Sequence, residues 1–230
     1  PDESIRKRAL DLTKEAADVC RELGGSVLTI WLAFDGFDYP FQAPYEEKWS
    51  QIKEAFREIA DYAKDIKISI EYKPFEPRNF SMLDSVGTTL LMAGDIDREN
   101  VGVTLDFCHM LMKHDGPAFG LSLAASRRKL FGLHMNDGYS RMDGGMIFGS
   151  VNFSHAIEFV YYLKKYHYDG VVFFDTFPVR EAAVEETGAN IAAFNKCLKL
   201  IDEIGMGTID AVVSSQDGVR AQKLILDMIR

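Results

Sequence analysis

Apolar residues recur along the chain in two alternating patterns, one typical of helices and one typical of short buried strands. Residues 3–23 carry apolar side chains roughly on one helical face and end at Gly24-Gly25. Residues 26–34 (SVLTIWLAF) form a short, partly β-branched apolar run, which favours a strand. The same reasoning predicts further helices over 45–64, 79–94, 117–128, 153–166, 189–204 and about 215–229, and strands over 67–73, 101–106, 130–135 and 170–175.

Five strands that are each followed by a helix predict an α/β fold with a parallel sheet. An open doubly wound sheet usually has a glycine-rich phosphate turn after its first strand, but the segment here is DGFDYPFQAP. A (β/α)8 TIM barrel fits better, because the ends of its consecutive strands converge on one axis. Five strands cannot close a barrel. We therefore expect the C-terminal five βα units of an incomplete barrel, with about three units absent upstream of Pro1.

The chain shows no low-complexity linker, so we expect a single domain over residues 1–230 with a C-terminal helical extension over about 207–230. Four of the predicted strands end on a side chain that can bind a divalent metal. These side chains are Glu71, Asp106, His134 and Asp175. Because a buried apolar strand must solvate such a group, its recurrence on consecutive strands predicts a shared metal.

Each of these residues also has an ordinary structural interpretation. Glu71 could pair with Lys73 at the strand end, and Asp106 could cap the turn that leads to His109. His134 could be a hydrogen-bonded core residue, with Asn136 and Asp137 as turn formers beside it. A set of three carboxylates and one imidazole nevertheless suits Mn, Mg, Co or Zn better than a thiolate-bound structural zinc.

Composition and net charge limit the kinds of molecule that this chain is expected to bind. Of the 230 residues, 47% are apolar and 27% are charged, and the formal net charge is −9, which disfavours nucleic acid and suits a neutral or cationic small molecule. The three cysteines Cys20, Cys108 and Cys197 lack C-x-x-C spacing, so we expect a reduced, cytoplasmic protein. No apolar run approaches about 20 residues, so we expect no membrane span.

The motifs EYKPFEPR, TLDFCH, LHMND followed by MDGGMIFG, and FFDT resemble, in this order, the xylose-isomerase-like barrel superfamily. The resemblance covers residues 1 to about 204 and is nearest to L-rhamnose isomerases of the bacterial type. It implies a first metal held by Glu71, Asp106, His134 and Asp175. It also implies a second, catalytic metal bound by His109 and Asp143.

The same resemblance implies that Lys73 polarises a substrate oxygen, that Asp143 takes part in proton transfer, and that Trp31 and His109 line the sugar pocket. Family members often carry two aspartates, one residue apart, in the loop of Asp143, whereas the second position here is Gly145. This departure predicts a weaker second metal.

The predicted function is a divalent-metal-dependent aldose–ketose isomerase acting at C1 and C2 of a free sugar. A ketose 3-epimerase, with Glu71 and Asp175 as its acid–base pair, is the alternative. A metal-dependent endonuclease would need more than the five histidines present and a basic groove. A non-catalytic fragment is a further alternative. We expect a homo-oligomer, with the terminal helix packing on a neighbour or on its own barrel.

Overall fold

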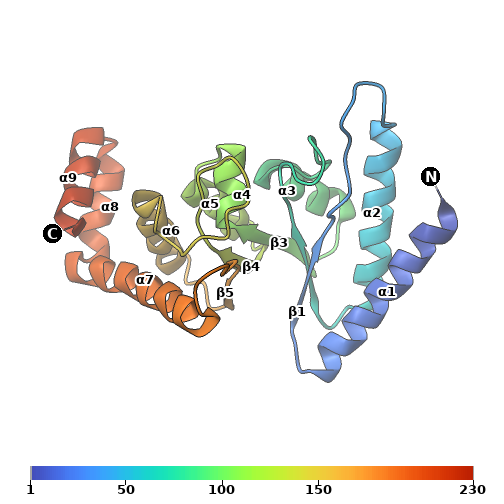
Figure 1. Cartoon of the computed structure of the whole chain (residues 1–230), viewed down its shortest axis with the longest axis horizontal. Helices are drawn as coiled ribbons and strands as arrows, with labels where there is room; N and C mark the ends of the chain where they lie inside the picture. Colours follow the sequence, from blue (N-terminus) through green and yellow to red (C-terminus); the bar gives the residue numbers. More distant parts are fainter. Residues whose placement is uncertain (1, 230) are drawn as a thin grey trace.

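Five parallel strands form one sheet whose order follows the chain, β1-β2-β3-β4-β5, in the computed structural model, which describes residues 2–229. The strands are β1 (Val27–Trp31), β2 (Lys67–Glu71), β3 (Val101–Asp106), β4 (Leu130–Met135) and β5 (Val172–Phe174). Figure 1 shows the strands side by side in the middle of the molecule. All five lie within or close to the predicted ranges, so the predicted parallel sheet is confirmed.

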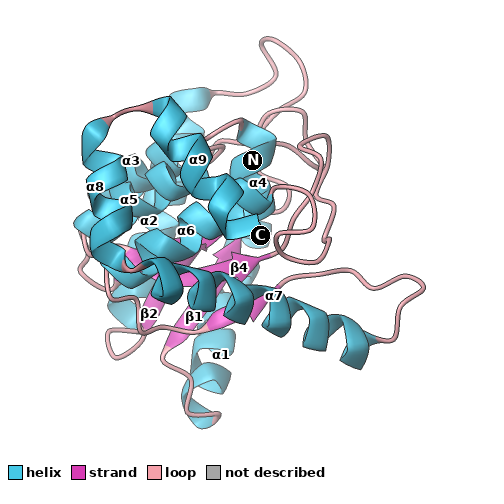
Figure 2. Cartoon of the chain, turned by 90° about the vertical axis from the view of Figure 1, so that its left-hand side faces the viewer, coloured by secondary structure: helices cyan, strands magenta, loops and turns pink. Residues whose placement is uncertain are grey.

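Most helices gather on one side of the strands (Figure 2). They are α1 (Glu3–Glu22), α2 (Tyr45–Tyr62), α3 (Val86–Ile96), α4 (Phe107–Lys113), α5 (Pro117–Ser126), α6 (Phe153–Lys165), α7 (Ala183–Ile204), α8 (Met206–Ser215) and α9 (Gly218–Ile229). Within residues 2–229, none is both long and apolar enough to cross a membrane.

The sheet curls, as a partial barrel requires. The Thr29 hydroxyl on β1 lies 3.1 Å from the Thr104 hydroxyl on β3, although β2 separates these strands. In a flat sheet, strands two apart are roughly 9.5 Å apart, so only strong curvature brings these hydroxyls together. Ser69 of β2 completes this inner layer at 2.6 Å from Thr104. The observed sheet is the incomplete TIM barrel that the sequence predicts.

The convex face of the sheet carries the hydrophobic core. Ile68, Ile70, Val103 and Leu105 are fully buried there, in one cluster with Met92 and Ile96 of α3 and Phe159 of α6. Alternation along β2 and β3 therefore sends apolar side chains outward to the helices and polar ones inward to the barrel axis. This division leaves the inner face free for chemistry.

The predicted helix 79–94 begins later than expected, at Val86. Ser85 caps it by accepting a hydrogen bond from the Thr88 backbone N–H, while the Thr88 side chain reaches back to the cap backbone. Residues 72–85 form a loop instead. Phe80 pairs with Phe37 through two backbone hydrogen bonds, so this loop is joined to the loop after β1.

Three other helix boundaries differ from the predictions. The short helix α4 follows β3 directly, with no connecting loop to mark it in the sequence. Helix α7 begins at Ala183, six residues before the predicted start at 189. The C-terminal extension contains two helices, α8 and α9, where the sequence pattern predicted one near 215–229.

Candidate metal centre

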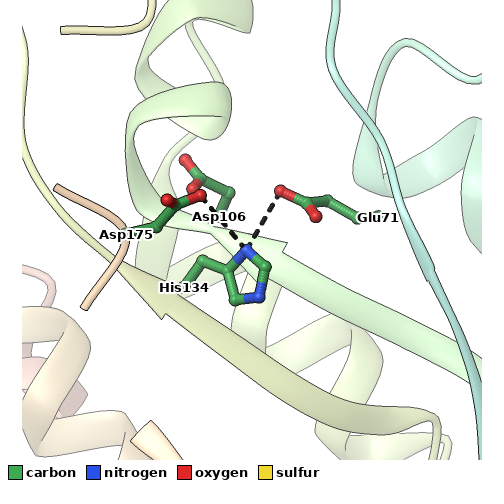
Figure 3. A group of neighbouring side chains, drawn as sticks. All are labelled: Glu71, Asp106, His134 and Asp175. Atoms are coloured by element: carbon green, nitrogen blue, oxygen red, sulfur yellow. Dashed lines mark hydrogen bonds and ion pairs between the residues drawn. The ribbon is translucent and has the colours of Figure 1, made fainter. Parts of the chain in front are cut away.

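Three side chains at the ends of β2, β3 and β4 and a fourth directly after β5 converge at one edge of the sheet (Figure 3). Glu71, Asp106, His134 and Asp175 each offer one ligand atom, and these atoms all lie within 4.8 Å of one another. The Nδ1 atom of His134 lies 3.1 Å from Glu71 Oε1 and 3.5 Å from Asp175 Oδ2. The sequence prediction that these four residues share a site is thus matched by their geometry.

Strand pairing explains why they meet. Asp106 pairs directly with His134, and Glu71 pairs with Thr104, which lies two residues before Asp106 on the same face of β3. Asp175 follows β5, where its backbone N–H donates to the Met135 carbonyl at 3.2 Å. Since all five strands are parallel, their carboxyl ends reach the same edge and deliver these groups together.

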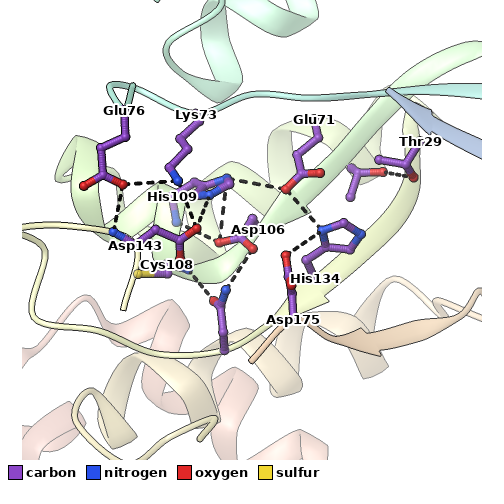
Figure 4. A network of polar contacts seen from close by, with 12 residues as sticks. Thr29, Glu71, Lys73, Glu76, Asp106, Cys108, His109, His134, Asp143 and Asp175 are labelled. Carbon is purple, nitrogen blue, oxygen red and sulfur yellow. Dashed lines mark hydrogen bonds and ion pairs between the residues drawn. The ribbon is translucent and has the colours of Figure 1, made fainter. Parts of the chain in front are cut away.

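A second group of side chains adjoins the first (Figure 4). Asp143 Oδ2 lies 3.1 Å from Lys73 Nζ and 3.2 Å from His109 Nε2. The other ring nitrogen of His109 lies 3.6 Å from Glu71 Oε1, so the two groups share Glu71 as a neighbour. The structure therefore brings all the sequence-predicted polar residues into one continuous network.

Glu76 belongs to this network, although the sequence analysis did not single it out. Its Oε2 atom lies 3.2 Å from Lys73 Nζ and accepts a hydrogen bond from the Asp143 backbone N–H at 3.3 Å. Glu76 lies three residues beyond Lys73, past the strand end, where strand periodicity says nothing about direction. It fixes both the ammonium and the loop that carries Asp143.

Two aromatic rings flank the network. The Trp31 ring centre, on β1, lies 5.3 Å from Lys73 Nζ, and the side chain is 44% exposed. Phe173, on β5, lies 5.2 Å from the His134 ring and is 53% exposed. Phe173 was missed, but its spacing of two from Asp175 places both on the same strand face and could have identified it.

The loop after β4 positions Asp143. Asp137 is fully buried, and its carboxylate accepts hydrogen bonds from the backbone N–H groups of Gly138, Val151 and Asn152. It therefore closes the loop rather than forming a simple turn. Gly145 has φ +50°, and a Cβ there would lie 2.2 Å from the Phe177 ring. An aspartate at position 145 would therefore require the Phe177 ring to move.

Charge controls protonation in the site. Burial raises the pKa of Asp106 to about 6, and the carboxylates of Glu71 and Asp143 add to this effect. Burial lowers the pKa of His109, but the charges of Asp106 and its neighbours outweigh it and raise that pKa to about 9. The pKa of His134 is also raised, because its bond to Glu71 overcomes burial. In both imidazoles the raised pKa favours the protonated ring, whose positive charge balances the surrounding carboxylates.

The residues present fit a divalent cation. Ligand atoms on opposite sides of such an ion lie about 4 Å apart, close to the observed spread of the four-residue cluster. The donor set of carboxylate oxygens and imidazole nitrogens suits Mg, Mn, Co or Zn. Two buried atoms next to the cluster, His109 Nδ1 and Asp143 Oδ1, have no hydrogen-bond partner among residues 2–229. A second ion beside Asp143 would give the latter oxygen a partner.

Comparison with known proteins places this geometry in a family. The sequence profile described as "xylose isomerase-like TIM barrel" matches residues 1–204, so α8 and α9 lie beyond the match. A xylose isomerase from Thermus thermophilus is 30% identical over 186 residues, which is 78% of this chain and 48% of that enzyme. The chain thus spans about half the length of the curated relatives it matches.

Solved structures agree on the fold. A D-tagatose 3-epimerase-like protein has a TM-score of 0.69 and 23% identity, covering 88% of this chain and 73% of its own. A D-allulose 3-epimerase from Methylomonas sp., solved in complex with D-allulose, has a TM-score of 0.63 and 25% identity, covering 88% and 70%. The strand order, the curl and the profile match together show that this chain belongs to the xylose isomerase-like TIM barrel family.

Proposed function

We propose that this chain carries the metal-binding half of a divalent-metal-dependent aldose–ketose isomerase that acts at C1 and C2 of a free sugar. The observation that carries the proposal is the position of Lys73. Its ammonium lies beside Asp143 and over the Trp31 ring, next to the four-residue cluster. A fixed cation at the mouth of an oxygen-rich site suits a reaction in which charge develops on a sugar oxygen.

One or two ions held by Glu71, Asp106, His134 and Asp175, and by His109 and Asp143, would supply Lewis acidity toward two neighbouring sugar oxygens. The Lys73 ammonium would stabilise negative charge on one of these oxygens. Burial favours the neutral form of Asp143, but His109 and Lys73 outweigh it and lower its pKa, so its carboxylate stays ionised and can hold a cation. Trp31 would offer an apolar face to the sugar ring.

Hydrogen would then move between C1 and C2, either as a hydride or through an enediol. Deuterium placed at C2 separates the two routes. Retention in the product would support the hydride route, whereas washout into solvent water would support the enediol.

A ketose 3-epimerase is the second candidate, and one observation favours it. Glu71 and Asp175 both contact His134 but come from β2 and β5, so they approach the site from different sides (Figure 3). Two carboxylates in such positions could act as acid and base on opposite faces of a sugar carbon. The similar structures named 3-epimerases are consistent with this chemistry.

We further propose a cytoplasmic homo-oligomer, and manganese as one of the metals that fit. Sedimentation of the intact protein would test the oligomeric state. Metal analysis after growth in mixed-metal medium would test the choice of ion.

The decisive assay uses the intact protein, loaded in turn with Mn2+, Mg2+, Co2+ and Zn2+, on a panel of aldoses and ketoses read by NMR. An isomerase interconverts the two classes, whereas an epimerase stays within ketoses. We expect Lys73→Met to abolish isomerisation. Lys67→Met, at the start of β2, is the matched control, because its ammonium lies over the Phe131 ring and away from the proposed metal centre. Metal-loaded protein that converts no sugar would refute a catalytic role.

A further inference from the structure

Asn136, a residue outside the proposed ligand set, joins two parts of the metal centre. It follows β4 two residues after His134 and is fully buried. Its Nδ2 atom donates to Asp106 Oδ2 at 2.9 Å, and its Oδ1 atom accepts from the Cys108 backbone N–H at 2.8 Å. The side chain therefore bonds at both ends, with the proposed ligand Asp106 on one side and the first turn of α4 on the other.

These bonds fix the orientation of Asp106. Its second oxygen, Oδ1, accepts from the His109 backbone N–H at 2.9 Å, so each carboxylate oxygen already has one partner. Each oxygen then retains a lone pair in a direction set by the protein. A carboxylate held in this way is already oriented for an ion, so binding does not require it to change its conformation.

The same amide also sets distances between ligands. Helix α4 is only seven residues long and carries His109 in its first turn, with Asp106 as its cap. Asn136 continues the strand that carries His134. By bonding to Asp106 and to the Cys108 backbone, Asn136 connects the end of β4 to the start of α4. It thereby fixes the positions of the His134 and His109 rings relative to the Asp106 carboxylate.

We infer that Asn136 is a positioning residue that sets the divalent-metal affinity of this centre. The inference rests on the proposed metal function of Glu71, Asp106, His134 and Asp175. The Asn136 amide donates to the carboxylate from Nδ2 and accepts from the backbone at Oδ1, two separate atoms that the single, shorter hydroxyl of serine does not supply. An aspartate at this position would keep the bond to Cys108 but would place an oxygen against Asp106.

The test is a Mn2+ titration against a competing chelator, made on metal-free wild type, Asn136→Asp and Asn136→Ser, with thermal unfolding of each metal-free protein. The serine variant is uncharged and guards against failure of the aspartate variant to fold. The matched control is Asn100→Asp. Asn100 donates to the Ala60 and Ala63 carbonyls at the opposite edge of the same sheet, so its loss destabilises the fold without touching the metal centre.

We expect both Asn136 variants to bind Mn2+ about 10- to 100-fold more weakly, as is typical when a partner of a metal ligand is removed. Their Co2+ absorption spectra should also differ from that of the wild type, a change that general destabilisation does not produce. Asn100→Asp should unfold at a lower temperature yet bind like the wild type. Folded Asn136 variants with wild-type affinity and spectra would overturn this inference alone. A wild type that binds no ion would overturn the proposed metal centre, and this inference with it.

Discussion

The two sides of the proposed metal centre differ in how they are built. On the β3–β4 side, Asp106 is fully buried and both its oxygens accept hydrogen bonds. On the β5 side, the Asp175 side chain is 31% exposed and follows a strand of only three residues, its carboxylate 3.5 Å from His134. The first side is therefore fixed by the fold, and we expect the second side to become fixed only when an ion binds.

The largest expected effect comes from removing one carboxylate from each side. Asp106→Asn should weaken Mn2+ binding by more than about 100-fold, because even the loss of a ligand's partner costs about 10- to 100-fold. Asp175→Asn should cost less, about tenfold, since solvent can replace an exposed ligand. Chelator competition measures both. Equal losses of Mn2+ affinity in the two variants would show that both sides contribute equally to metal binding.

Adding the ion should order the β5 side. At 100 times its Kd, a bound ion stabilises the folded protein by about 2.7 kcal/mol, which calorimetry would detect. Hydrogen exchange should slow most around residues 172–176, and less along β3, which is already buried. The Glu71→Gln variant should show neither change. Uniform protection across the sheet would argue against a difference between the two sides.

Metal affinity should rise with pH. Without a bound ion the pKa of His109 is raised to about 9, so an ion that binds this ring below about pH 9 must displace a proton; the pKa of His134 is raised as well, so the same competition extends to that ring. Affinity should therefore increase up to about tenfold per pH unit for each proton released between pH 7 and 9. His109→Gln should flatten part of this slope. Affinity independent of pH would mean that the imidazoles are not ligands.

The smallest expected effect concerns the second ion. Lys73 holds Asp143 Oδ2 at 3.1 Å and so competes with any cation for that oxygen. Lys73→Met should strengthen binding of a second ion by up to about tenfold, or about 1.4 kcal/mol. Isothermal titration would resolve the two binding events, with Lys67→Met as the control that leaves both unchanged. A weaker second ion in Lys73→Met would contradict this competition.

Much of this site could be predicted because strand periodicity and parallel pairing determine it. Glu71, Asp106 and His134 lie on strands whose faces alternate regularly, so their convergence follows from the sequence once the sheet is inferred. The role of Glu76 could not be predicted, because loop geometry directs its side chain, and Asn136 was interpreted only as a turn former beside His134. The late start of α3 also escaped prediction, since the loop before it is held by contacts with residues 35 and 37, distant in sequence.

The most direct test of a divalent-metal centre at this sheet edge is anomalous diffraction from a crystal of the Mn2+-loaded protein, recorded near the manganese absorption edge. The account predicts a peak about 2.0–2.3 Å from ligand atoms of Glu71, Asp106, His134 and Asp175. Manganese that binds elsewhere on the chain, or a fully loaded crystal with no peak among these four residues, would contradict it.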